Sequence, residues 1–212
     1  MLSLHKLAAA SALAILCSLP VAAIPIYGNF DFSGGQAFLS SAGVDFLPLG
    51  GGNGIFSISN PVSASFAGMA GTGGTIGDLL TSNGRVPGVA LNDSGFIAIA
   101  GQPTWNFVLR YITPGAQGWY TLTQVGSSVF AGIELSGIAI NTGTLEESGW
   151  VASLTTQFTS TTVAVLQQTI ANGNAPQNSW SGTFQSTPEP GSALTLLSGL
   201  ALAGLGIYRR RT

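Results

Sequence analysis

Histidine, lysine and cysteine are almost absent from this chain of 212 residues. Each occurs once, and all three lie near the N-terminus, as His5, Lys6 and Cys17. A Ser-His-Asp triad and a Cys-His pair both need a histidine, and a Walker loop and a Schiff base both need a lysine. Zinc sites are built mainly from cysteine and histidine. The rest of the chain lacks the residues for these sites, and we expect neither a cofactor nor a metal ion.

Charge is also scarce, because charged residues make up only 7% of the chain, against roughly 25% in ordinary globular proteins. Between the two ends the only bases are Arg85 and Arg110. Seven acids lie in the same region: Asp31, Asp45, Asp78, Asp93, Glu134, Glu146 and Glu147. This mildly acidic body would repel a phosphate backbone, so nucleic-acid binding is not expected. Low charge with 45% hydrophobic residues predicts a folded chain rather than a disordered one.

The N-terminus has the parts of a secretory signal peptide. His5 and Lys6 form a short basic start, an apolar run extends from Leu7 to Leu19, and the small residues Val21-Ala22-Ala23 follow. This order predicts that residues 1–23 are a signal peptide cleaved after Ala23, which would remove the histidine, the lysine and the cysteine. The alternative is an uncleaved membrane helix, but the run is short for a hydrocarbon core of ~30 Å.

The C-terminus consists of three parts. The triplet Pro188-Glu189-Pro190 is not expected to continue a helix or a strand, since proline lacks an amide donor and fixes φ. Residues 192–208 contain no charge, and as a helix they would span ~25 Å, slightly less than a bilayer core. Arg209, Arg210 and Arg211 follow, and they predict that the C-terminus faces the cytoplasm while the body lies outside.

The order of triplet, apolar helix and arginine cluster resembles the PEP-CTERM sorting signal of exported proteins of Gram-negative bacteria. The resemblance covers Pro188 to Arg211, within a C-terminal segment of residues 188–212. It implies that Pro188, Glu189 and Pro190 are the sorting motif, that the apolar segment is a transmembrane helix, and that Arg209 to Arg211 are a cytoplasmic stop. An exosortase would then cleave near the triplet and release the body or transfer it to the surface. The alternative is a plain tail anchor behind a proline-rich linker.

A second stretch, GIFSISNPVSASFAGMAGTGGTIGDL over residues 54–79, also carries a resemblance. It is similar to a pattern in one group of PEP-CTERM exported proteins: an alternating strand, a Phe-Ala-Gly step, a Gly/Thr turn and a TI-x-DL strand. The resemblance implies no particular biochemical activity.

The middle of the chain, residues 24–187, predicts one β-rich domain. The 30 glycines of the chain, about twice the usual share of ~7%, recur in turn-like clusters: SGG at Ser33, GGGNG at Gly50, TGG at Thr72, SNG at Ser82, NDSG at Asn92, TPG at Thr113 and NTG at Asn141. Short apolar or alternating runs lie between them, beginning at Gly54, Phe96, Trp105, Trp119, Ile133, Trp150 and Gln177. Short strands joined by tight turns predict an all-β fold with a single antiparallel sandwich or barrel.

One segment within this domain has a helical pattern. Residues 160–173 offer Ser160 or Thr161 as an N-cap, and they end at Gly173. Val163, Leu166 and Ile170 lie at helical spacing between them. The domain is therefore predicted to contain one short helix.

Carboxylates are the acid–base candidates that remain. A glycosidase needs two of them, about 5–10 Å apart. Glu146 and Glu147 are adjacent, so on a strand they would point to opposite faces, and the other acids lie in separate turns and strands. We therefore expect solvated acids rather than a catalytic pair, and no enzymatic activity. Asn92-Asp93-Ser94 is expected to cap its own turn rather than to hold an ion.

The four tryptophans allow two interpretations. Trp105, Trp119, Trp150 and Trp180 could form a surface on which sugars stack, or they could belong to the core. Aromatic residues contribute strongly to the packing of protein cores. We therefore expect the tryptophans to lie in the core.

Two classes of function remain open. The leading hypothesis is a non-enzymatic exported protein of the cell surface or the extracellular matrix of a biofilm. Its partners during export would be signal peptidase and an exosortase, and it would lie in the inner membrane only transiently. The alternative is a carbohydrate-binding or carbohydrate-acting module associated with exopolysaccharide.

Overall fold

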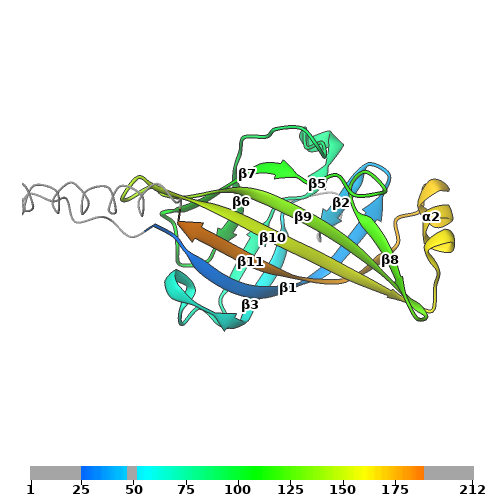
Figure 1. Cartoon of the computed structure of the whole chain (residues 1–212), viewed down its shortest axis with the longest axis horizontal. Coiled ribbons are helices and arrows are strands. Elements are labelled where there is room, and N and C mark those ends of the chain that lie inside the picture. Colours follow the sequence, from blue (N-terminus) through cyan, green and yellow to red (C-terminus); the bar gives the residue numbers. More distant parts are fainter. Residues whose placement is uncertain (1–24, 47–51, 189–212) are drawn as a thin grey trace, which may run out of the picture.

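The computed structural model describes residues 25–46 and 52–188, which are mostly antiparallel strands (Figure 1). In chain order the strands are β1 (Gly28–Ser40), β2 (Gly43–Phe46), β3 (Gly54–Val62), β4 (Gly73–Ile76), β5 (Leu79–Leu80), β6 (Asp93–Ile99), β7 (Trp105–Ile112), β8 (Thr121–Val125), β9 (Ser128–Asn141), β10 (Glu146–Thr159) and β11 (Gln177–Pro188). Two short 3-10 helices, η1 (Ala64–Phe66) and η2 (Thr81–Asn83), and the α-helix α2 (Val163–Ala171) lie between them. The predicted signal peptide and the apolar C-terminal segment lie outside the described residues.

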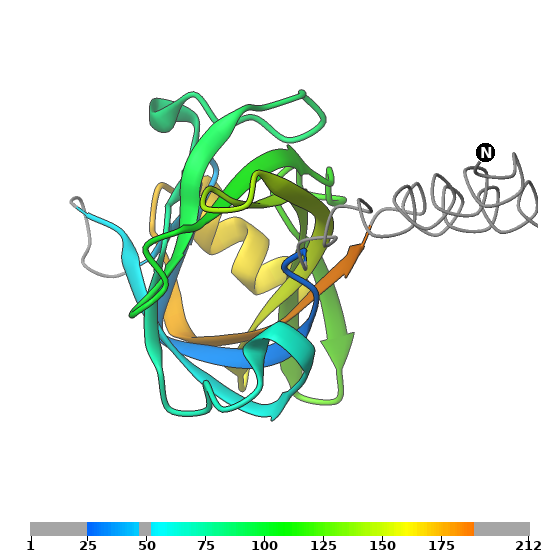
Figure 2. The ribbon, with the colours of Figure 1, turned by 90° about the vertical axis from the view of Figure 1, so that its left-hand side faces the viewer.

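Eight of the strands close into a barrel. The order around the ring is β1, β3, β4, β6, β7, β9, β10 and β11, and β11 pairs with β1 to complete it. Figure 2 shows this ring viewed along the barrel. The other three strands extend the ring locally, since β2 pairs with β1 and β5, and β8 pairs with β9. The antiparallel all-β prediction is confirmed, and the structure is a barrel rather than a sandwich.

The apolar and alternating runs of the sequence correspond to strands, and the run that begins at Trp105 is β7. However, β9, β10 and β11 are longer than the predicted runs, at 14, 14 and 12 residues. The 13-residue strand β1 was not predicted. Two predicted turns are instead irregularities within strands: SGG in β1, where the register shifts after Gly34, and NDSG in β6, where Gly95 has a φ of 69°. Glycine at these places interrupts the ladder without ending the strand.

The barrel interior is filled by aromatic side chains. Phe30 is fully buried, with its ring centroid 4.7 Å from those of both Phe66 and Phe184. The alternation expected in the run that begins at Gly54 is confirmed, because Phe56 and Ile58 face this core, whereas the serines between and after them face solvent. Other buried members of the cluster are Phe32, Phe46, Phe107, Trp150, Trp180 and Leu154.

Several buried rings lie directly opposite a glycine on the neighbouring strand. Trp180 on β11 pairs with Gly34 on β1, and Trp150 on β10 pairs with Gly137 on β9. A β-carbon at either glycine would collide with the indole ring. Two further pairs have the same form, Phe56 with Gly74 and Phe32 with Gly182. The high glycine content therefore serves the core as well as the turns.

The two ends of the barrel are covered by different elements. At one end the η1 segment inserts Phe66, which is fully buried against Phe30 and Phe184. Helix α2 lies across the other end, as Figure 2 shows, and it buries Leu166 and Ile170. The predicted helix is confirmed, but its N-cap is Thr162 rather than Ser160 or Thr161. Among the described residues, no helix is both long and apolar enough to cross a membrane.

The first and last strands lie side by side, so the described ends of the chain meet at the η1 end of the barrel (Figure 1). Gly28 pairs with Ser186, whose hydroxyl donates a hydrogen bond of 2.7 Å to the Ile26 carbonyl. The triplet was expected to begin after the last strand. Instead, β11 runs as far as Pro188, which pairs with Ser148, so the first proline of the triplet belongs to this strand. The other predicted sorting and cleavage residues lie outside the described residues: Ala23, Glu189, Pro190 and Arg209 to Arg211.

Candidate binding groove on the outer face of the barrel

The predicted acid–base candidates are widely spread over the barrel. Asp31 on β1 and Glu134 on β9 both point outward, but β11 and β10 lie between their strands. Three strand spacings amount to ~14 Å, beyond the separation of a glycosidase pair. Glu146 and Glu147 occupy successive positions of β10, as expected for opposite faces; Glu147 is exposed and Glu146 is partly buried.

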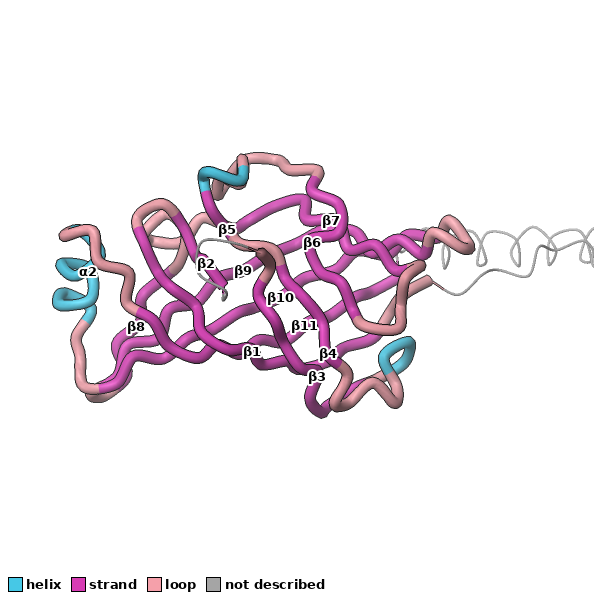
Figure 3. Tube along the Cα trace, turned by 180° about the vertical axis from the view of Figure 1, so that it is seen from behind, coloured by secondary structure: helices cyan, strands magenta, loops and turns pink. Residues whose placement is uncertain are grey.

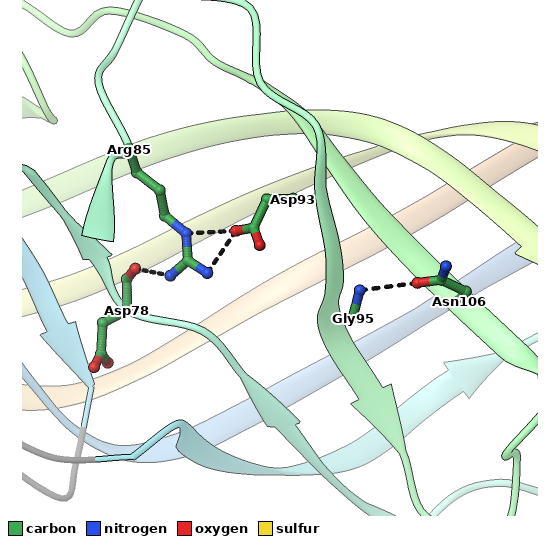
Figure 4. A network of polar contacts seen from close by, with 5 residues as sticks. All are labelled: Asp78, Arg85, Asp93, Gly95 and Asn106. Atoms are coloured by element: carbon green, nitrogen blue, oxygen red, sulfur yellow. Dashed lines mark hydrogen bonds and ion pairs between the residues drawn. The ribbon is translucent and has the colours of Figure 1, made fainter.

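Asp93 and Asp78 belong to a network around Arg85, the first of the two bases in the body. Figure 4 shows the guanidinium held between the Asp93 carboxylate and the Asp78 backbone carbonyl. Both Nε and Nη2 of Arg85 lie 2.5 Å from Oδ2 of Asp93, and the guanidinium lies 5.1 Å from the Phe96 ring centroid. Nearby, the Gly95 amide donates a 2.8 Å hydrogen bond to Asn106. Asp93 therefore anchors an arginine instead of capping its own turn, which corrects the prediction.

Asp78 is a buried acid that the sequence did not distinguish from the others. It is 7% exposed, and its carboxylate accepts a 2.9 Å hydrogen bond from the Phe46 amide. Burial raises the pKa of Asp78, and the nearby Asp45 adds to the rise, whereas the Phe46 amide and Arg85 oppose it. The structure thus brings two acids together that the sequence left apart. The contacts of Asp78 hold β2 and the β5 segment beside β6, on the side of the barrel seen in Figure 3.

The tryptophans belong to the core, as predicted. Trp119, Trp150 and Trp180 are 6%, 2% and 3% exposed, and Trp105 is half-buried against the same cluster. The alternative interpretation, in which these four residues form a sugar-stacking surface, is therefore wrong. Any binding surface of the barrel has to be sought among its other residues.

The outer face of β3, β1, β11, β10, β9 and β8 carries two parallel rows of small polar residues. Strand pairing aligns the first row across five strands: Ser59, Asp31, Thr183, Ser153 and Glu134. The second row lies two residues further along each strand: Ser57, Ser33, Ser181, Thr155, Gly132 and Thr121. Most of these strands face the viewer in Figure 1. Alternation places all eleven positions outside, because their neighbours along each strand fill the core.

Two hollows of about 310 Å³ each follow these rows across the strands. One is lined by residues of β3, β1, β11 and β10, and the other by residues of β10, β9 and β8 together with the loop at Thr113. Ser153 and Thr155 line both hollows, so the two hollows adjoin each other at β10. We call these two adjoining hollows together the hydroxyl groove. Sequence reasoning missed it, since its members come from six strands and each resembles an ordinary solvated residue.

Hydroxyl side chains line the hydroxyl groove together with apolar residues such as Pro114 and Phe130, and no base lines it. Its charged residues are Asp31 and Glu134, and within the described part of the chain neither forms an ion pair. A serine or threonine hydroxyl offers one donor and two acceptor positions, and a carboxylate offers acceptors only. The groove can therefore hydrogen-bond a ligand rich in hydroxyl groups. Its two acids are too far apart to act together on one bond.

Within the described residues, no group of three or more histidine, cysteine, aspartate or glutamate side chains could hold a metal ion. Comparisons of the whole chain with protein-family models, with curated proteins and with solved structures found no match.

Proposed function

We propose that this chain is a non-enzymatic exported protein of the cell surface or the extracellular matrix, sorted by an exosortase. The supporting observation is the pair of terminal segments in the sequence. Residues 1–23 have the composition of a signal peptide, and the Pro188-Glu189-Pro190 triplet is followed by an apolar segment and Arg209 to Arg211. The body between them lacks histidine, lysine and cysteine.

The barrel geometry is compatible with removal of both segments. They join the barrel at neighbouring places, because the start of β1 pairs with the end of β11. Cleavage after Pro188 would leave every strand of the ring in place, since β11 ends at that residue. In this proposal the mature protein is the barrel alone.

Mass spectrometry of the intact protein from cells with and without exosortase tests this proposal. With the enzyme, the mature mass should lack both the first 23 residues and the segment after the triplet. Without it, the C-terminal segment should remain and the protein should stay with the inner membrane. An unchanged mass and location in the two strains would refute exosortase sorting.

A carbohydrate-binding module is the second candidate function, and the hydroxyl groove is the observation that favours it. The separation of Asp31 and Glu134 favours binding over hydrolysis. Retention of the protein on exopolysaccharide would support this candidate. It is compatible with the first one, because a matrix protein can act by binding the polymer around it.

A further inference from the structure

The hydroxyl groove runs across the strands rather than along them. Each step from one strand to the next is ~4.8 Å, and the two rows lie ~7 Å apart along each strand. A polymer lying in the groove would therefore meet a new pair of side chains at each step. A step of this size is close to the length of one sugar ring in an extended glycan.

Three features of the groove determine which polymer it fits. Serine and threonine are short, so fixing their rotamers costs less than fixing long polar side chains. No base lines the groove, while Asp31 and Glu134 would repel uronic acids, sulfate and phosphate. Their carboxylates are also strong acceptors for the hydroxyl groups of a neutral sugar. These features favour an uncharged polyhydroxylated chain.

Gly132 leaves a gap in the second row, between Thr155 and Thr121. A β-carbon at this position would point into open space, with its nearest neighbour, the Thr121 carbonyl oxygen, 4.0 Å away. The glycine is therefore not needed for packing. Its absent side chain keeps the groove open where it crosses β9.

We propose that the hydroxyl groove binds an extended, uncharged polysaccharide, which lies across β1, β11, β10 and β9 between the two rows of polar residues. Ser153 and Thr155 are the central contacts, because they line both hollows. This inference rests on the second candidate function, for which it names the site and the class of ligand.

Affinity electrophoresis of the full chain, purified in mild detergent, tests the proposal directly. The gels contain hydroxyethylcellulose as the neutral polymer or alginate as the acidic one. We expect hydroxyethylcellulose to retard the protein and alginate to have no effect. Absence of retardation by hydroxyethylcellulose, or equal retardation by both polymers, would overturn the proposal.

Two matched pairs of variants then locate the site. Gly132→Ile fills the groove and should raise the dissociation constant obtained from the retardation at least about tenfold, which corresponds to ~1.4 kcal/mol. Gly149→Ile adds the same side chain at another open position, on β10 outside the two hollows, and should change nothing. Thr155→Val removes a groove hydroxyl while preserving shape and should also weaken binding, whereas Thr75→Val, on β4, should not.

Equal behaviour of the two glycine variants, with Thr155→Val also binding like the wild type, would show that the groove is not the site. Circular dichroism establishes that each variant is folded, and the threonine pair keeps the test decisive if an isoleucine variant fails to fold. Binding is measured on purified protein. A failure here therefore differs from a failure of export, which is measured by mass and location in cells.

Discussion

At the residue scale, glycine makes room for aromatic rings. Gly34 and Gly137 lie opposite Trp180 and Trp150, and each indole occupies the space that a side chain would need. A glycine inside a strand costs conformational entropy and loses packing area. Here the cost is offset by the burial of a large ring against the backbone of the next strand.

We expect Gly137→Ala to lower the free energy of unfolding by about 1–3 kcal/mol, as overpacking of a core does. A β-carbon at Gly137 would lie 2.5 Å from the Trp150 ring and would also collide with the Val108 carbonyl oxygen. Urea denaturation measures the change. Gly132→Ala on the same strand is the matched control and should cause no loss, because that position is open. Equal losses in the two variants would contradict the packing argument.

Asp78 should make the stability of the protein depend on pH. Its pKa in the folded protein is raised above 3.8, so the folded state binds a proton more readily than the unfolded state does. Stability should therefore rise as the pH falls through the raised pKa, and the gain should be complete below 3.8. The charged groups that act on Asp78 are Asp45, which adds to the rise, and Arg85, which opposes it.

Two substitutions separate the charge of Asp78 from its hydrogen bond. Asp78→Asn keeps an acceptor for the Phe46 amide and removes the buried charge, so at pH 7 it should be at least as stable as the wild type. Asp78→Ala leaves that amide without its partner, which costs about 1–3 kcal/mol when the group is buried. Denaturant titrations at pH 7 and pH 4.5 measure both effects. A wild type that loses stability relative to Asp78→Asn on acidification would show that the sign is wrong.

At the scale of elements, α2 is tied to the barrel by its apolar face and by one glutamine. Leu166 and Ile170 are buried. The Gln124 side chain accepts a 3.0 Å hydrogen bond from the Val163 amide and donates a 3.2 Å one to the Thr161 carbonyl. A helix of nine residues is marginal on its own in water, so these contacts account for its formation.

Leu166→Ala should lower the free energy of unfolding by about 2–5 kcal/mol, the usual range for a buried leucine. Val165, also on α2, is 56% exposed, so Val165→Ala should have little effect. Thermal unfolding followed by circular dichroism distinguishes the two variants. Similar melting temperatures for both would show that α2 does not stabilise the barrel.

At the scale of the whole molecule, the sequence predicted local structure much better than arrangement. The alternation in the Gly54 run and the helical spacing at Leu166 depend on neighbouring residues, so both predictions were correct. Closure of the ring depends on the pairing of β1 with β11, in which Gly28 lies opposite Ser186. The Ser186 hydroxyl also bonds the Ile26 carbonyl, 160 positions away, and no local pattern reports such distant contacts. The hydroxyl groove was missed for the same reason: strand register alone brings Ser153, Thr183 and Asp31 into one row.

Because β1 pairs with β11, the barrel can close only after the last strand has been synthesised. The strand that completes the ring is the last part of the barrel to be synthesised, so β1 and β10 each wait with an unpaired edge until residues 177–188 arrive. Loop closure over such a distance is slow and costly in entropy, and open edges invite pairing with other chains. We therefore expect a chain that stops before Gln177 to remain an open sheet that associates with other chains, rather than to form a smaller barrel.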